Sequence, residues 1–167
     1  MSGKPIALIT GGAQGIGYSC AEALIEDGYD VILSDINADG VTTAGKALNA
    51  LDAIACDMGD PEQVKSMFAQ IMADHGPVHA LVNNAGVAMP GDFLTYDFET
   101  FERVIDINLK GVFLATQLAA QAMVTHKIEG AIVNMSSINA QVAIPAIPAY
   151  CASKGGVMQI TKVAALA

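Results

Sequence analysis

The chain of 167 residues has the length of one domain, and 53% of its residues are hydrophobic, so it can bury a core of its own. Only 15% of the residues are charged, which excludes a disordered tail, because such tails combine high charge with low hydrophobicity. The net charge of −9 repels phosphate backbones and anionic lipid headgroups, which argues against nucleic-acid and membrane-surface partners.

The N-terminal segment Met1–Pro5 leads directly into a strand-like run without a signal-peptide pattern, and no apolar stretch is long enough to span a bilayer. We therefore expect a soluble, cytoplasmic protein. The three cysteines, Cys20, Cys56 and Cys151, are odd in number and lack the spacing of a metal site. We expect them to be free thiols in a reducing compartment, with no bound metal.

Five short apolar runs predict strands. Each run ends at a polar residue, and none alternates between apolar and polar positions. This pattern is typical of parallel strands that are covered on both faces. In chain order, the runs are Ile6–Ile9, Val31–Leu33, Ala53–Cys56, Ala80–Val82 and Ala131–Val133.

Helix-like stretches alternate with these runs, and the clearest follows the third. Asp60 predicts its N-cap, Pro61 suits the first helical position, and Gln63 completes a capping box. One apolar stripe follows at helical spacing, and Gly76 with Pro77 ends the helix. The stripe consists of Val64, Met67, Phe68, Ile71 and Met72.

The remaining helices are predicted more briefly. Ile16, Cys20 and Leu24 share the buried face of the first helix, which ends at Gly28. A long helix is expected from about residue 98 to about residue 126, and another begins near Tyr150 and continues to the end of the chain.

The order of elements is therefore strand and helix in strict alternation, five times over. This order predicts right-handed crossovers and an α/β fold with a doubly wound parallel sheet of the Rossmann type. The sequence contains no internal repeat, low-complexity stretch or linker. We expect residues 1–167 to belong to a single domain.

A glycine-rich turn, Thr10–Gly17, joins the first strand to the first helix. Gly11, Gly15 and Gly17 allow a tight turn and a close approach of backbone to a pyrophosphate, which the helix N-terminus also attracts. A tight strand-to-helix connection without a ligand is the alternative. The strand before the turn, the helix after it and an acidic residue about 20 residues further on favour the phosphate loop.

That acidic residue is Asp35, at the end of the second run. Its carboxylate can accept hydrogen bonds from both ribose hydroxyls of NAD and would repel the 2′-phosphate of NADP. Gln14 is neutral at a position where a basic residue would attract that phosphate. Both residues favour NAD over NADP, although Asp35 could also be an ordinary solvated carboxylate at a strand end.

Ser137, Tyr150 and Lys154 form a candidate catalytic group. Tyr150 and Lys154 are one helical turn apart and share a face. A free tyrosine has a pKa near 10 and is a poor base at neutral pH, but a nearby ammonium favours its phenolate. A serine hydroxyl at the end of the neighbouring strand could hold the reacting oxygen of a substrate.

With these motifs in place, the sequence resembles the short-chain dehydrogenase/reductase family, in its compact single-domain branch. The resemblance extends from Lys4 to Ala167 and rests on five elements in the family's order and approximate spacing. These are Thr10-Gly11-x-x-x-Gly15-Ile16-Gly17, Asn83-Asn84-Ala85-Gly86, Asn108 in the long helix, Ser137, and Tyr150-x-x-x-Lys154.

The resemblance implies roles for the catalytic residues. Tyr150 would be the general acid in carbonyl reduction and the general base in alcohol oxidation, and Lys154 would favour its phenolate and bind the nicotinamide ribose. Ser137 would orient the substrate oxygen; its neighbour Ser136 lacks the family's thirteen-residue offset to Tyr150. Asn108 would hold a water in a proton relay, or it is a mid-helix asparagine bonded to backbone.

The resemblance also implies a cofactor site. Gly11, Gly15 and Ile16 would hold the pyrophosphate of NAD. Asp57 would approach the adenine ring, and Asn84 and Gly86 would line the central part of the cofactor. Hydride would pass between the nicotinamide and a substrate carbon.

Members of this family are about half as long again, so the resemblance implies that the chain lacks the family's C-terminal third. We expect the sheet to be incomplete after the fifth strand and its following helix. The fifth strand would then form an uncovered apolar edge. Residues 142–147 are apolar and favour a hydrophobic or small alcohol or ketone as substrate.

The leading hypothesis is thus an NAD-dependent oxidoreductase that acts on an alcohol or ketone. One alternative is a dinucleotide-binding fragment without turnover. Another is a subunit-association fragment, because the family pairs the helices that carry Asn108 and Tyr150 across a homodimer or homotetramer.

Overall fold

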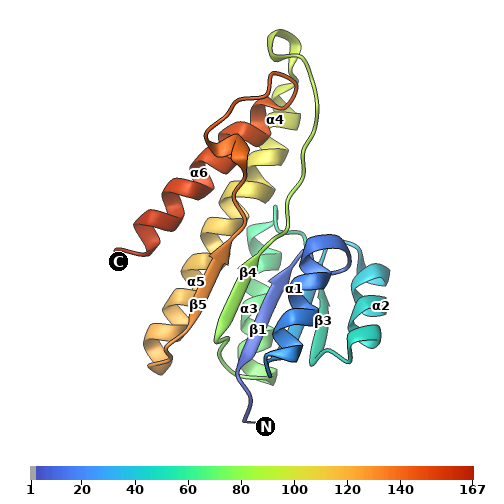
Figure 1. Ribbon diagram of the computed structural model, residues 1–167, viewed down its shortest axis with the longest axis vertical. Coiled ribbons are helices and arrows are strands. Elements are labelled where there is room, and N and C mark those ends of the chain that lie inside the picture. Colours follow the sequence, from blue (N-terminus) through green and yellow to red (C-terminus); the bar gives the residue numbers. More distant parts are fainter. Residues whose placement is uncertain (1–2) are drawn as a thin grey trace.

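The computed structural model describes residues 3–167, and the first two residues of the expected domain lie outside this range. The described chain contains a five-stranded, entirely parallel sheet with the order β3-β2-β1-β4-β5 (Figure 1). This arrangement confirms the predicted α/β fold of the Rossmann type. The strands are β1 (Ile6–Thr10), β2 (Asp30–Asp35), β3 (Asp52–Ala55), β4 (Ala80–Asn83) and β5 (Ala131–Asn134).

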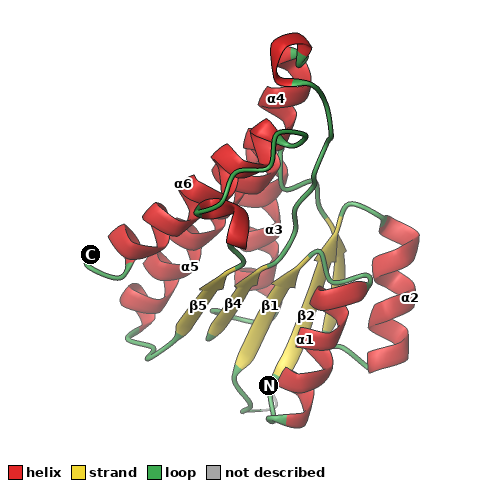
Figure 2. Ribbon diagram, turned by 45° about the horizontal axis from the view of Figure 1, so that its top comes forward, coloured by secondary structure: helices red, strands yellow, loops and turns green. Residues whose placement is uncertain are grey.

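The described chain contains six α-helices, of which α1 to α5 lie between strands and α6 follows the last strand. Figure 2 shows α1 and α2 on one side of the sheet and α3 and α5 on the other. Figure 1 shows α4 and α6 rising side by side beyond the carboxyl ends of the strands. The helices are α1 (Gly15–Glu26), α2 (Ala38–Leu48), α3 (Pro61–Asp74), α4 (Phe98–Ile105), α5 (Val112–His126) and α6 (Pro148–Ala164).

Two apolar clusters, one on each face of the sheet, explain the lack of alternation in the strands. Successive residues of a strand point to opposite faces. In β1, Ala7 and Ile9 join the cluster with α1 and α2, whereas Leu8 joins the cluster with α3 and α5. All five residues of β1 are therefore buried.

The helix predicted after the third strand is confirmed as α3. Val64, Met67 and Ile71 are buried along one face, and Asp60 caps the helix by accepting from the backbone N–H groups of residues 62 and 63. The capping box differs from the expectation in one bond. Gln63 Oε1 accepts from the N–H of Asp57, 3.0 Å away, and so ties the helix to the end of β3.

The predicted buried face of the first helix is wrong at Ile16, which is 64% exposed. Gly17 and Ala21 are buried in α1 instead. Small residues let the helix lie close to β1 and the preceding loop, and Ile16 is left at the surface beside that loop. The helix ends at Glu26, before Gly28 with its positive φ of 90°.

The long helix predicted for residues 98–126 contains an irregularity. A π-helical segment, η2 (Asp106–Gly111), separates α4 from α5. Such π-helical turns are frequently found at functional sites. Two short 3₁₀ helices, η1 (Phe93–Thr95) and η3 (Ile138–Ala140), lie in the connections before α4 and after β5. The last helix begins at Pro148, two residues before Tyr150, which confirms its predicted start.

The fifth strand lies at one edge of the sheet, as expected. β5 pairs with β4 alone in the described sheet, and Ala131 and Val133 are exposed. None of the helices among residues 3–167 is long and apolar enough to cross a membrane.

Candidate active site

An open cleft of about 540 Å³ lies at the carboxyl ends of β1 to β4. In a parallel sheet of this topology, this is where the connections leave room for a ligand. The cleft brings together eight of the residues predicted to bind the cofactor, namely Gly11, Gln14, Gly15, Ile16, Asp35, Asp57, Asn84 and Gly86.

The glycine loop forms one wall of the cleft. Gly11 and Gly15 have φ angles of +65° and +59°, which favour glycine, and a Cβ at Gly11 would lie 2.9 Å from the Cα of Ala85. Gln14 precedes α1 in an extended conformation and its side chain does not cap the helix. The first N–H groups of α1 are therefore available to an anionic group.

Gly17 is not part of the cleft lining, but it packs against the glycine loop from beneath. A Cβ at Gly17 would lie 2.2 Å from the carbonyl oxygen of Gly11 and 2.6 Å from Nδ2 of Asn84. The lack of a side chain is thus what allows α1 to pack under the loop.

Asp35 closes the loop from the end of β2. Its Oδ2 accepts from the N–H of Ala13 at 3.1 Å, and its Oδ1 accepts from the N–H of Asn37 at 3.0 Å. The carboxylate is therefore held at a fixed place between the glycine loop and the start of α2, rather than moving freely in solvent.

The end of β4 is tied to the same loop. Asn84 Nδ2 donates to the carbonyl oxygens of Thr10 and Gly11, at 3.1 and 3.0 Å. In return, Thr10 Oγ1 accepts from the N–H groups of Asn84 and Ala85. These bonds fix the segment that leads to Gly86, two residues further on, which lines the cleft.

Asn108 lies in the π-helical segment and is fully buried. Its Oδ1 accepts from the N–H of Val87, and its Nδ2 donates to the carbonyl of Val87, both at 2.8 Å. Nδ2 also donates to Ser153 Oγ at 3.1 Å. Asn108 is thus bonded to backbone, but to the backbone after β4 rather than to its own helix, and it joins that segment to α6.

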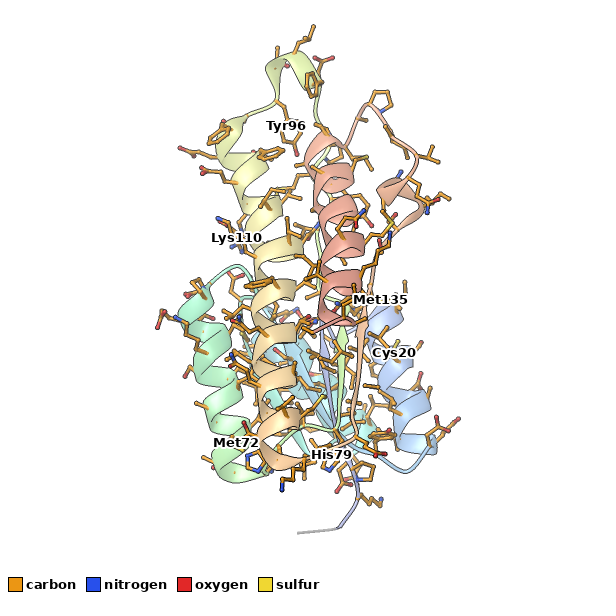
Figure 3. The ribbon with its side chains drawn as sticks, turned by 90° about the vertical axis from the view of Figure 1, so that its left-hand side faces the viewer. Cys20, Met72, His79, Tyr96, Lys110 and Met135 are labelled. Carbon is orange, nitrogen blue, oxygen red and sulfur yellow. The ribbon has the colours of Figure 1, made fainter. Side chains whose placement is uncertain are left out.

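Lys154 and Tyr150 share a face of α6, as their spacing predicts. Lys154 Nζ lies 5.6 Å from the centre of the Tyr150 ring and donates to the carbonyl of Met135 at 2.6 Å. Figure 3 shows Met135 beside α6, just after β5. Burial lowers the pKa of Lys154, because removal from water disfavours the ammonium.

The two neighbouring serines after β5 have different partners. Ser137 Oγ accepts from the N–H of Asn139 at 3.1 Å and donates to Asn139 Oδ1 at 3.2 Å. Ser136 Oγ instead donates to the carbonyl of Lys154 at 3.2 Å. Ser136 therefore anchors α6, while Ser137 caps the short helix η3.

The predicted residues thus form two groups that meet at Gly86. Gly86 lines the cleft, and a Cβ there would lie 3.2 Å from Asn108 Oδ1 and 3.7 Å from Lys154 Nζ. Asn108, Tyr150, Lys154 and Ser137 are not part of the cleft lining itself. They lie on the elements beyond it, on η2, α6 and the segment after β5.

Half of the residues that line the cleft were not predicted from the sequence. Four of these residues directly follow predicted ones and could have been found by adjacency, whereas Arg103 and Ile107 come from α4 and η2, which no local motif links to the cleft. Arg103 Nη2 donates to Asp57 Oδ2 at 2.7 Å. The missed residues are Ile36, Cys56, Met58, Ala85, Val87, Met89, Arg103 and Ile107.

A parallel sheet of this order, with a glycine loop before α1 and a carboxylate at the end of β2, defines an α/β protein of the dinucleotide-binding class. The family model of the short chain dehydrogenases matches residues 5–167. The chain therefore belongs to the short-chain dehydrogenase family, whose members are oxidoreductases that use a nicotinamide dinucleotide. The resemblance inferred from the motifs is confirmed.

Curated relatives support the same assignment. The NADP-dependent (R)-specific alcohol dehydrogenase of Lentilactobacillus kefiri is 36% identical over 169 residues, which cover 99% of this chain and 67% of the relative. The 3-oxoacyl-(acyl-carrier-protein) reductase FabG of Staphylococcus aureus is 37% identical over 164 residues, covering 95% of this chain and 66% of the relative. The chain spans about two thirds of the length of these relatives.

Proposed function

We propose that the protein is an oxidoreductase that transfers a hydride between NAD(H) and an alcohol or ketone, with Tyr150 as the general acid and base. The observation that carries this proposal is the position of Gly86. This residue lines the dinucleotide cleft and at the same time lies against Asn108 and Lys154. The cofactor cleft therefore ends where the groups for proton transfer begin.

The cleft suits a dinucleotide in size and in chemistry. Its volume of about 540 Å³ is within the usual range of small-molecule sites. The uncapped N-terminus of α1 would hold the pyrophosphate, with Gly11, Gly15 and Ile16 around it. Asp35 would accept from the adenosine ribose, Asp57 would approach the adenine ring, and Tyr150 and Lys154 would reach the nicotinamide ribose.

The bound dinucleotide would supply or accept the hydride. Tyr150 would give a proton to the substrate oxygen in reduction and take it in oxidation. Lys154 Nζ lies 5.6 Å from the centre of the Tyr150 ring, and burial lowers the pKa of Lys154, which lets it exchange a proton more readily. Ser137 would hold the substrate oxygen.

The hydrogen bonds of Asn108 narrow the two roles that the sequence leaves open for it. Both its oxygen and its amide nitrogen are engaged, with Val87 and Ser153. We propose that its side chain fixes α6 relative to β4, and that any relay water is held by backbone groups of the π-helical segment rather than by the Asn108 amide.

The substrate is proposed to be small or apolar. The segment of residues 141–146, which precedes α6, is exposed, and its apolar members Val142 and Ile144 are 55% and 44% exposed. An apolar wall of this kind favours a hydrophobic alcohol or ketone over a polyanionic substrate.

The proposed preference for NAD rests on Asp35. It requires a direct test, because one relative is named as NADP-dependent. We expect the chain to bind NADH more tightly than NADPH in a titration that follows the fluorescence of the reduced nicotinamide. Asp35→Ala should weaken NADH binding roughly tenfold or more, since hydrogen bonds to a charged acceptor are lost. It should leave or improve NADPH binding.

Asp39→Ala, which removes an exposed acid from the first turn of α2, is the matched control and should change neither affinity. Equal or tighter binding of NADPH by the unaltered chain would contradict the NAD preference. Unchanged selectivity in Asp35→Ala would remove this residue from the ribose site.

The proton-transfer role is tested with Tyr150→Phe. We expect kcat for reduction of a small apolar ketone to fall at least about 100-fold, because a positioned proton donor contributes on this order. NADH affinity should fall far less than kcat, because the change removes at most one neutral hydrogen bond, worth about 0.5–1.5 kcal/mol. Tyr29→Phe, a tyrosine packed against the opposite apolar cluster, is the control; a Tyr150→Phe variant with most of its rate would contradict the mechanism.

A second candidate function is subunit association, as a homodimer or homotetramer. An apolar groove of about 720 Å³ runs between α5 and α6, and Val124 and Val163 on its walls are 79% and 67% exposed. Exposed apolar patches of this kind mark association surfaces. A chain that sedimented as an oligomer but bound neither dinucleotide would favour this role over turnover.

A further inference from the structure

We infer that Arg103 is a positioning residue of the dinucleotide cleft, which holds the carboxylate of Asp57 in place to read the adenine ring. The inference rests on the proposed function, and it adds a residue that lies outside the glycine loop and outside the catalytic group. Arg103 belongs to α4, 46 residues away from Asp57 in the chain.

The contact between the two residues is direct and closely fitted. Asp57 follows β3, and its Oδ1 accepts from the N–H of Gly59 at 2.8 Å. Its Oδ2 accepts from Arg103 Nη2 at 2.7 Å. A Cβ at Gly59 would lie 2.5 Å from Arg103 Nη1, so the guanidinium packs on a residue that has no side chain.

The loop after β3 is also held from a second point. A Cβ at Gly111, the last residue of the π-helical segment, would lie 2.2 Å from the carbonyl oxygen of Met58. Arg103 and Gly111 thus place the same loop against one continuous stretch of helix. That stretch also carries Asn108, so the adenine end and the catalytic end of the site are built on one support.

The charged residues of the cleft indicate what the ion pair between Arg103 and Asp57 does. Of the described residues that line the cleft, Arg103 alone is basic, and it faces Asp57 rather than standing free. A carboxylate has about four acceptor positions, and Arg103 and Gly59 occupy two of those on Asp57. The side chain remains 21% exposed, which leaves acceptor positions open toward the cleft.

A carboxylate fixed in this way distinguishes bases by their hydrogen-bond pattern. The 6-amino group of adenine is a donor and suits it. Hypoxanthine has a carbonyl oxygen at the same place, and two acceptors that face each other repel. Adenine selectivity therefore reports the position of Asp57, and a part-exposed ion pair that served stability alone would not affect it.

The experiment compares the binding of NADH with that of reduced nicotinamide hypoxanthine dinucleotide to the 167-residue chain. We expect the unaltered chain to prefer NADH roughly tenfold, as the loss of a hydrogen bond to a charged group predicts. Arg103→Ala should reduce this preference to about twofold, the factor that the weakest net hydrogen bonds contribute. Arg103→Lys should restore part of it, because lysine keeps the charge but not the planar fork.

Two further variants separate positioning from direct contact and from general destabilisation. If Arg103 acts through Asp57, the double variant Asp57→Ala/Arg103→Ala should show the same preference as Asp57→Ala alone. Lys65→Ala, which breaks an exposed ion pair on α3, should keep the full preference.

Arg103→Ala with undiminished adenine preference would overturn the inference while leaving the proposed function intact. The same holds if the double variant loses further selectivity beyond Asp57→Ala, because Arg103 would then touch the ligand itself. Failure of the unaltered chain to bind either dinucleotide would overturn the proposed function and the inference together.

Discussion

The first and last strands of the chain differ sharply in their surroundings. Every residue of β1 is buried, and helices cover the sheet on both sides of it. In β5, Ala131 and Val133 are exposed, and the strand forms an edge of the described sheet. The glycine loop leaves the first of these strands, and the segment with Ser137 leaves the second.

The two halves of the site are accordingly built in different ways. The proposed cofactor half is set by backbone: positive φ angles, an uncapped helix N-terminus and close packing of Gly17 under Gly11. The proposed catalytic half is set by polar side chains that reach across elements. Asn134 Nδ2 donates to Thr161 Oγ1 at 3.0 Å, and Lys154 Nζ donates to the carbonyl of Met135.

The largest effect expected from this contrast concerns two helical glycines, Gly17 in α1 and Gly155 in α6. Gly17→Ala should destabilise the fold by about 3 kcal/mol, because its Cβ would overlap the fixed carbonyl of Gly11. Gly155→Ala should stabilise it by up to about 1 kcal/mol, since alanine is the better helix former and the nearest atom, the carbonyl oxygen of Ala140, is 3.9 Å away.

Urea denaturation of the two variants and the unaltered chain measures both changes, and each variant serves as the other's control. Equal destabilisation by both substitutions would show that α6 is packed as tightly as α1. The contrast between the two halves of the site would then be wrong.

The fold was predictable because its signals are local. The apolar runs, the turn at Thr10–Gly17 and the cap at Asp60 each depend on neighbouring residues, and β1 to β5 appear where these signals place them. The family was predictable for a related reason: three of its motifs lie at or just after the ends of β1, β4 and β5, and the other two lie on helices, always in the same order along the chain.

The parts that were not predictable depend on contacts between distant segments. Arg103 meets Asp57 across 46 residues, and no spacing rule connects α4 to the end of β3. The sequence around Asn108 likewise predicts an ordinary helix. Its π-helical distortion accompanies hydrogen bonds from Asn108 to Val87 and Ser153, which lie far away in the chain and leave no local signal. The exposure of Ile16 follows from the close packing of Gly17, which apolar periodicity does not register.

Cysteine labelling compares the end of β3 with α6 without any mutation and therefore disturbs the protein least. Cys56 at the end of β3 is 3% exposed, and burial, with the nearby charges of Asp57 and Asp60, raises its pKa from 9.0 to about 11. Cys151 in α6 is partly exposed. Because the thiolate is the reactive form, iodoacetamide at pH 8 should alkylate Cys151 and spare Cys56.

The pH dependence follows from the direction of the shift. A thiol whose pKa is raised by folding stays protonated in the native state, so Cys56 should remain unlabelled until the pH approaches 11. Over the same interval above pH 9, the native state loses stability, because the unfolded chain releases this proton more readily. Peptide mass spectrometry of the labelled chain at several pH values reads out each cysteine separately. Labelling of Cys56 at pH 8 as fast as that of Cys151 would mean that the end of β3 opens as readily as α6, and the cofactor half of the site would not be the more rigid one.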